Sequence, residues 1–177
     1  LEKASALQPE TFEILFNLGE TYLRSGNYAK AEVVLNRALK LQPDSAATLA
    51  LLSQVYSGQN RAVDALDFLA RAHKLAPENP DITLLLARLS MAQNYFEDAI
   101  PLLESGLKTA PQRADLHAAL GESYVMTDRA EKAIEECKIL VRLNPSAPSF
   151  AALGLSYRHL GRFDESRKNF QEGLKLD

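Results

Sequence analysis

The residues best suited to nucleophilic chemistry are His117 and Cys137, because an imidazole can take the proton of a thiol that is held close to it. They fall on successive predicted helices, so the two side chains could approach one another. Both positions, however, correspond to places where other parts of the chain carry Leu or Phe, which is typical of packing between helices. We therefore expect a buried thiol beside a core histidine, and no catalytic residues.

The remaining ionisable residues do not form a pattern that indicates a catalytic or metal site. Glu97-Asp98 and Glu135-Glu136 are adjacent acids on predicted helices, and neighbours at that spacing point in different directions. His73 and His159 are expected on the surface, and no three ligands converge. The sequence has no Gly-rich phosphate loop and no HExxH motif. We therefore predict that the chain is not an enzyme and that it holds no metal and no cofactor.

Composition and charge exclude several further classes of protein. The 177 residues carry a formal net charge of -3, so we expect no broad basic face for nucleic acid. No apolar run approaches the roughly 18–20 residues of a membrane-spanning helix, so we expect no direct membrane insertion. The single Cys137 excludes an internal disulfide. The chain opens at Leu1 without a targeting segment, which suggests a fragment of a longer protein and leaves its localisation unknown.

The chain repeats itself every 34 residues, and three residue types follow this period. The prolines of the series are Pro9, Pro43, Pro77, Pro111 and Pro145. The alanines are Ala31, Ala65, Ala99 and Ala133, and the cations are Lys40, Lys74, Lys108 and Arg142. Between Pro145 and Phe150 one residue is missing relative to the period. Such a period predicts stacked supersecondary units in which each unit covers the apolar face of the next.

Each unit is predicted to consist of two helices. In the first complete unit, apolar residues from Leu15 to Leu23 recur at spacings of three and four, which places them on one helix face. A turn at Gly26 follows, because glycine adopts left-handed backbone angles at little cost. The second helix ends before Pro43, since the residue that precedes a proline avoids the helical region. Gly19 is expected at the crossing of the two helices, where small residues allow close approach.

This pattern resembles the tetratricopeptide repeat. In the first unit it consists of Leu15, Leu18, Gly19, Tyr22, Ala31, Leu35, Ala38 and Pro43. The pattern recurs in four more units, of which the third is the weakest, with Gly106 in place of the later Ala. We expect a single domain over residues 1–177. It would hold the end of a preceding repeat at 1–11 and repeats at about 12–45, 46–79, 80–113, 114–147 and 148–177.

The resemblance implies an all-α, right-handed superhelical solenoid of antiparallel helix pairs. Its concave face would be lined by the first helix of each pair and would bind a peptide or helix of a partner protein. Helical spacing and the family's geometry together predict these residues on that face: Phe16, Asn17, Glu20, Gln54, Leu84, Arg88, Met91, Glu122, Val125, Met126, Leu155 and Arg158. The apolar members could form a strip flanked by charges that suits an amphipathic helix or an apolar peptide. Alternatively, some of them pack between neighbouring helices.

Two more specific functions of similar proteins do not fit this sequence. Chaperone-binding members of the family hold a terminal carboxylate with basic residues and an asparagine drawn from successive repeats. The corresponding positions, counted from the first repeat, hold Phe16, Glu20, Leu51, Asp81 and Leu85, and later windows match no better. A chaperone C-terminal tail is therefore not an expected partner. Pentatricopeptide repeats, which read RNA, share the layout but have a different pattern and a basic surface.

The predicted function is that of a protein–protein interaction scaffold. Two alternatives stay open at this point. The chain could be an assembly module that forms oligomers, or the accessory arm of an enzyme whose catalytic domain lies outside this sequence. Phe170, Leu174 and Leu176 favour self-association through the repeat ends, because a solenoid end without a polar cap exposes apolar surface.

Overall fold

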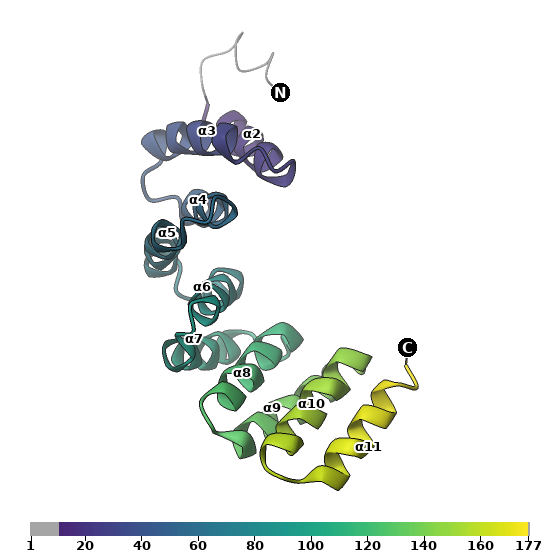
Figure 1. Cartoon of the computed structure of the whole chain (residues 1–177). Coiled ribbons are helices and arrows are strands. Elements are labelled where there is room, and N and C mark those ends of the chain that lie inside the picture. The colour runs from purple at the N-terminus through teal and green to yellow at the C-terminus, as the bar shows by residue number, and fades with distance from the viewer. Residues whose placement is uncertain (1–10, 177) are drawn as a thin grey trace. The chain divides into compact units, whose positions relative to one another are not determined.

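The computed structural model describes residues 11–176, which form helices joined by short connections, with no strand among them. Successive helices form antiparallel pairs (Figure 1). Their bounds are α2 Phe12–Arg24, α3 Tyr28–Leu41, α4 Ala46–Gly58, α5 Ala62–Leu75, α6 Pro80–Ala92, α7 Phe96–Thr109, α8 Ala114–Met126, α9 Ala130–Leu143, α10 Ala147–His159 and α11 Phe163–Gly173. This order confirms the all-α class and the helix pairs that the 34-residue period predicts. The end of a preceding repeat, expected at residues 1–11, lies outside the described residues except for Thr11, which caps α2.

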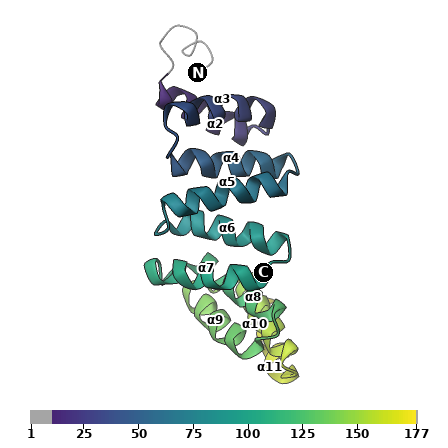
Figure 2. The ribbon, with the colours of Figure 1, turned by 90° about the vertical axis from the view of Figure 1, so that its left-hand side faces the viewer.

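The chain divides into two compact units, residues 1–77 and residues 78–177. The first unit contains α2 to α5, and Figure 2 shows α2 beside α3 and α4 beside α5. Its first pair closes over a core formed by Leu15, Leu18, Val34 and Ala38. The expectation of one domain over residues 1–177 stays a prediction.

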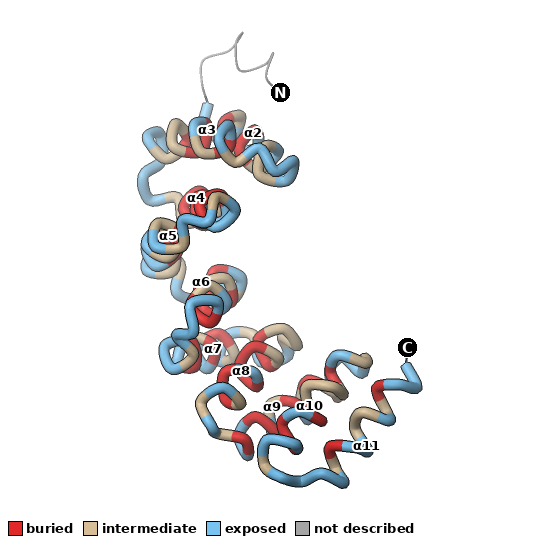
Figure 3. Tube along the Cα trace, in the orientation of Figure 1, coloured by how far each residue is buried: buried red, intermediate tan, exposed pale blue. Residues whose placement is uncertain are grey.

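The second unit contains α6 to α11 and holds a larger core. Leu103, Leu116 and Leu120 lie at its centre and are almost completely buried. A further cluster joins α9 to α10 through Ile134 and Tyr157. In Figure 3 the buried residues lie on the sides of the helices that face other helices, whereas the connections are exposed. Within the second unit, each helix pair therefore buries its apolar stripe partly within itself and partly against the neighbouring pair.

The two helices of each pair cross at a small residue of the first helix. This position holds Gly19, Ser53, Ala87, Gly121 and Gly154, and all five are buried. A Cβ on Gly19 would lie 2.4 Å from the side chain of Leu35, which is fully buried. Any larger residue would push the second helix away from the first, because the interior is close-packed. The close approach expected at Gly19 is thus present.

The turn inside each pair contains one residue with left-handed backbone angles. These residues are Gly26, Asn60, Asn94, Asp128 and Gly161, with φ between 60° and 75°. Glycine has no Cβ to oppose this conformation, and Asn and Asp tolerate it better than other residues do. The sequence identifies this turn only at the glycines, because Asn and Asp are also common outside turns.

Side-chain caps begin most of the first helices of the pairs. Thr11, Ser45, Asn79 and Ser146 each accept a hydrogen bond from a backbone N–H in the first turn of the following helix. These bonds satisfy donors that the helix cannot satisfy itself. The N-cap of α8 is Arg113, which gives no such bond and turns its side chain to other partners.

Tyrosines tie some helix pairs to the pair before them. The Tyr56 hydroxyl on α4 donates to Glu32 on α3 at 3.2 Å, and the Tyr124 hydroxyl on α8 donates to Glu104 on α7 at 2.6 Å. Burial is the main reason that the pKa of Tyr124 lies above its ordinary value, so the hydroxyl remains a donor at neutral pH. These bonds fix the register between neighbouring pairs within each unit.

No helix in residues 11–176 has the length and apolar character that crossing a membrane requires.

The turn geometry predicts the effect of substitutions at Gly26. Its φ is 72°, and a Cβ there would meet no atom within 4 Å, so a substitution tests backbone conformation alone. We expect Gly26→Val to lower the free energy of unfolding by about 1–2 kcal/mol, because a β-branched residue opposes left-handed angles. Gly26→Asn, which copies the residue at Asn60, should cost clearly less. Urea unfolding followed by circular dichroism measures both, and equal losses in the two variants would contradict the assignment.

Candidate protein-binding groove

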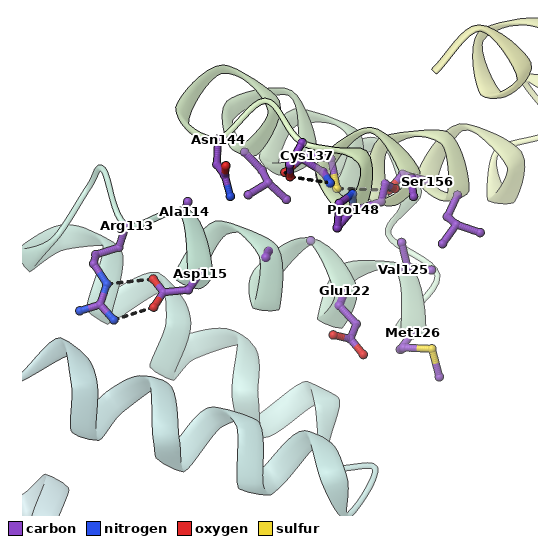
Figure 4. A pocket seen from close by; sticks show the side chains of 18 of the residues that line it. Arg113, Ala114, Asp115, Glu122, Val125, Met126, Cys137, Asn144, Pro148 and Ser156 are labelled. Atoms are coloured by element: carbon purple, nitrogen blue, oxygen red, sulfur yellow. Dashed lines mark hydrogen bonds and ion pairs between the residues drawn. The ribbon is translucent and has the colours of Figure 1, made fainter. Parts of the chain in front are cut away.

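A groove of about 960 Å³ lies in the second unit between α8 and α10, and α9 contributes Cys137 and Leu140 to it (Figure 4). Its walls come mainly from residues spaced three and four apart on α8 and α10. On α8 these are Ala114, Ala118, Gly121, Val125 and the neighbouring Glu122 and Met126. On α10 they are Pro148, Ala151, Ala152 and Leu155. Because most of these side chains are small or apolar, the groove has an apolar lining and space above its walls.

Tight packing of α9 against its neighbours forms one side of the groove. A Cβ on Gly121 would lie 3.0 Å from the Cys137 sulfur, so glycine allows α9 to approach α8 closely. The Cys137 sulfur lies 3.5 Å from the Ser156 hydroxyl oxygen on α10. Burial raises the pKa of the Cys137 thiol. The thiol is therefore a packing element of the groove and not an activated nucleophile.

One end of the groove carries a charged cluster around Arg113. Its guanidinium donates to both carboxylate oxygens of Asp115, at 2.8 and 2.6 Å, and to Asp81 at 2.7 Å. The hydrogen bonds from Arg113 hold the pKa of Asp115 below its usual range. The same carboxylates raise the pKa of Arg113. Arg113 and Asp115 thus remain charged at neutral pH, and the cluster contains two acidic side chains and one cationic side chain.

The lining of the groove includes a second acid, Glu122, which stands among apolar residues. Glu122 is exposed and belongs to the α8 wall, which also contains Val125 and Met126. Figure 4 draws Glu122 near Met126 and away from the Arg113–Asp115 pair. Within residues 11–176 Glu122 has no hydrogen-bond or ion-pair partner. It is therefore a carboxylate that a bound molecule can reach.

His117 and Cys137 do not form the nucleophilic pair that their sequence positions allow. His117 is buried, and its Nδ1 lies 2.6 Å from a Glu136 carboxylate oxygen. Its Nε2 lies 3.0 Å from the carbonyl oxygen of Pro111. Both ring nitrogens are thus engaged by oxygen atoms, while Cys137 faces Ser156. Among the described residues no group of three or more His, Cys, Asp and Glu is placed to hold a metal ion.

Four of the residues predicted for partner binding meet in this groove. They are Glu122, Val125, Met126 and Leu155. Met126 and Leu155 retain 56% and 39% exposure, so their apolar side chains are available to another molecule. Arg158, one turn further along α10, is exposed but does not line the groove, and Arg88 on α6 is likewise exposed outside it.

The other predicted residues lie elsewhere. Leu84 and Met91 keep only 7% and 8% exposure and pack in the core that contains Leu116, Ala119 and Leu120. They are core residues of the second unit, and we leave them out of the proposed surface. In the first unit Asn17 and Gln54 are exposed, whereas Phe16 and Glu20 are half-buried.

Several lining residues were not predicted. Cys137 and Ser156 lie at the base, the connection between α9 and α10 adds Asn144 and Ser146, and the first turn of α10 adds Pro148 and Ser149. The residue missing between Pro145 and Phe150 was the available signal, because a shortened connection changes the path of the chain at that point. The new direction of the chain depends on the backbone angles of the connection, and the 34-residue period gives no information about those angles.

Burial of Cys137 predicts slow alkylation. Because its pKa is raised, the reactive thiolate forms only at a higher pH than in an unfolded chain. We expect iodoacetamide to modify native Cys137 at least about ten-fold more slowly than the urea-unfolded chain at pH 8.5, with the native rate still rising above that pH. Mass spectrometry of timed samples measures both rates. Equal rates would contradict the burial of this thiol.

Comparison with solved structures finds the same fold in MamA proteins. A crystal structure of MamA protein superposes with a TM-score of 0.85 at 23% identity, over 93% of this chain and 91% of that one. MamA AMB-1 gives 0.83 at 22% identity, over 92% and 97% of the two chains. MamA RS-1 ArsTM double mutant gives 0.87 at 19% identity, over 95% of each. At these identities the likeness concerns the fold alone.

Comparison with family models covers nearly the whole chain. Tetratricopeptide repeat models match residues 10–78, 91–154 and 147–177. A search of curated protein sequences gives no significant match. The repeated crossing residues, the left-handed turns and these matches agree, and the chain belongs to the tetratricopeptide repeat family.

Proposed function

We propose that this chain is a protein–protein interaction scaffold and that the groove between α8 and α10 holds a peptide or helix of a partner protein. The repeat family supports the scaffold role, and the groove supports the place of binding. The observation that carries the proposal is the coincidence of predicted binding residues with an apolar groove. Glu122, Val125, Met126 and Leu155 come together there from two different helices.

The exposed apolar side chains provide a driving force for association. Met126 and Leu155 lose contact with water when a partner covers them, which favours binding in proportion to the apolar area removed. The small residues Ala118 and Ala151 leave space in which large apolar side chains of a partner can pack. A groove of this kind suits a segment that presents apolar residues along one side.

The length of the groove fits a short segment. From Ala114 to Val125 the α8 wall extends roughly 16 Å, at 1.5 Å per residue. About three turns of a partner helix, or about five residues of an extended peptide, cover the same distance. A short linear segment is therefore enough to occupy it.

Filling the groove is expected to abolish binding. Peptides selected from a random displayed library on the immobilised chain supply the probe, and isothermal titration calorimetry measures their affinity. Ala118→Trp places a large ring in the groove and should weaken binding at least about ten-fold. Ala70→Trp, at an exposed position of α5 outside the groove, is the matched control and should bind as the wild type does. Unchanged affinity in folded Ala118→Trp would refute the proposed site.

Self-association is a second candidate, supported by the apolar surface of α10 and α11. A smaller cavity of about 430 Å³ there is lined by Ala147, Pro148, Ala151, Phe170, Gly173 and Leu174. Leu174, which lines this cavity, is 73% exposed, and Leu176 is 53% exposed. A second copy of the chain that covered these side chains would remove them from water.

Sedimentation velocity tests this second candidate. The wild-type chain should shift to larger species as its concentration rises, and the Leu174→Glu, Leu176→Glu double variant should remain monomeric, because charged side chains oppose burial. Lys168→Glu, at an exposed position of α11, serves as the control for added negative charge. A wild-type chain that stays monomeric throughout would exclude self-association through this face.

A further inference from the structure

The groove between α8 and α10 has a negative charge balance. Its lining contains one cationic side chain, Arg113, and two acids, Asp115 and Glu122. Asp81 adds a third acid through its ion pair with Arg113. The lysines and the other arginines are not part of this lining. A ligand in the groove therefore meets more negative than positive charge.

Arg113, the one cationic side chain of the lining, is already paired with acidic side chains of the chain itself. Three hydrogen bonds engage the Arg113 guanidinium with Asp115 and Asp81, and the pair with Asp115 is bidentate. Such a planar, two-bond pairing is strong and directional. An acidic ligand would have to compete with two carboxylates for this guanidinium. The groove therefore lacks a free anchor for a terminal carboxylate or an acidic motif.

Glu122, in contrast to Arg113, has no oppositely charged partner among the described residues. It lines the groove beside Val125 and Met126, and no cation within residues 11–176 pairs with it. Arg88, at the equivalent place of the preceding helix pair, forms no ion pair with it. When a partner covers the apolar residues around Glu122, the carboxylate loses water and needs a new partner, because burying an unpaired charge is costly.

Resting on the proposed function, we propose that the bound segment carries a lysine or arginine next to its apolar side chains, and that this cation pairs with Glu122. A cation satisfies the carboxylate when the surrounding residues are covered, and it also complements the net charge of the lining. An aliphatic stem of lysine or arginine can lie along Val125 or Met126 while its charged end reaches Glu122. The partner is thus a cationic, amphipathic protein segment.

Parallel selections from one random peptide library test this charge preference. Peptides are selected on the wild-type chain, on Glu122→Lys and on the control Glu131→Lys, which makes the same charge change at an exposed position of α9 outside the groove. We expect Lys and Arg to be enriched beside apolar residues on the wild type and on the control. On Glu122→Lys the enrichment should shift to Asp and Glu.

A double-mutant cycle then measures the pair itself. The best wild-type peptide is compared with its variant that has glutamine in place of the selected cation, on the wild-type chain and on Glu122→Gln. Removing the cation should weaken binding about three- to five-fold on the wild type and leave it unchanged on Glu122→Gln, as expected for one partly exposed ion pair. Circular dichroism checks that each variant is folded.

The outcomes separate this inference from the proposed function. Selected peptides that compete for the groove but have no enrichment of Lys or Arg would overturn the charge preference and leave the docking site in place. A cation effect that is equal on the wild type and on Glu122→Gln would overturn the role of Glu122. If Ala118→Trp blocks none of the selected peptides, the proposed docking site is wrong, and this inference is wrong with it.

Discussion

The close crossing of two helices at a small residue is the constraint on which the rest of this structure depends. Gly19, Gly121 and Gly154 bring the second helix of a pair against the backbone of the first, and Ser53 and Ala87 occupy the same place in the other pairs. Helices packed so closely cannot bury all of their apolar surface within one pair. Within each unit, neighbouring pairs therefore cover part of each other's apolar surface.

The groove is a consequence of this packing. Because Gly121 admits the Cys137 sulfur, α9 lies close to α8 while also contacting α10 through Ser156. Small residues then line both walls, and the larger Met126 and Leu155 remain exposed. A partly buried network of His117, Glu136 and the Pro111 carbonyl oxygen links α8, α9 and the connection before α8. Structure and candidate function thus share the same residues, and binding needs no catalytic group.

Much of the fold could be predicted from the sequence, because a 34-residue period reports stacked helix pairs directly. Helical spacing also placed Glu122 and Leu155 on exposed helix faces, and the structure has both exposed in the lining of the groove. Helical spacing failed to show that Leu84 and Met91 are core residues, since their burial depends on how α6 packs against the following helices. The pairing of Arg113 with Asp115 and Asp81 could not be predicted from the sequence either, because it joins side chains from two helix pairs. Periodicity describes one helix at a time, and the site is formed between helices.

The proposed occupant of the groove between α8 and α10 is a cationic, amphipathic segment. A crystal structure of the chain with the tightest library-selected peptide tests it most directly. We expect apolar peptide side chains above Ala118 and Ala151 and a lysine or arginine nitrogen within about 4 Å of the Glu122 carboxylate. A peptide bound on another face of the chain, with the groove holding only water, would contradict it.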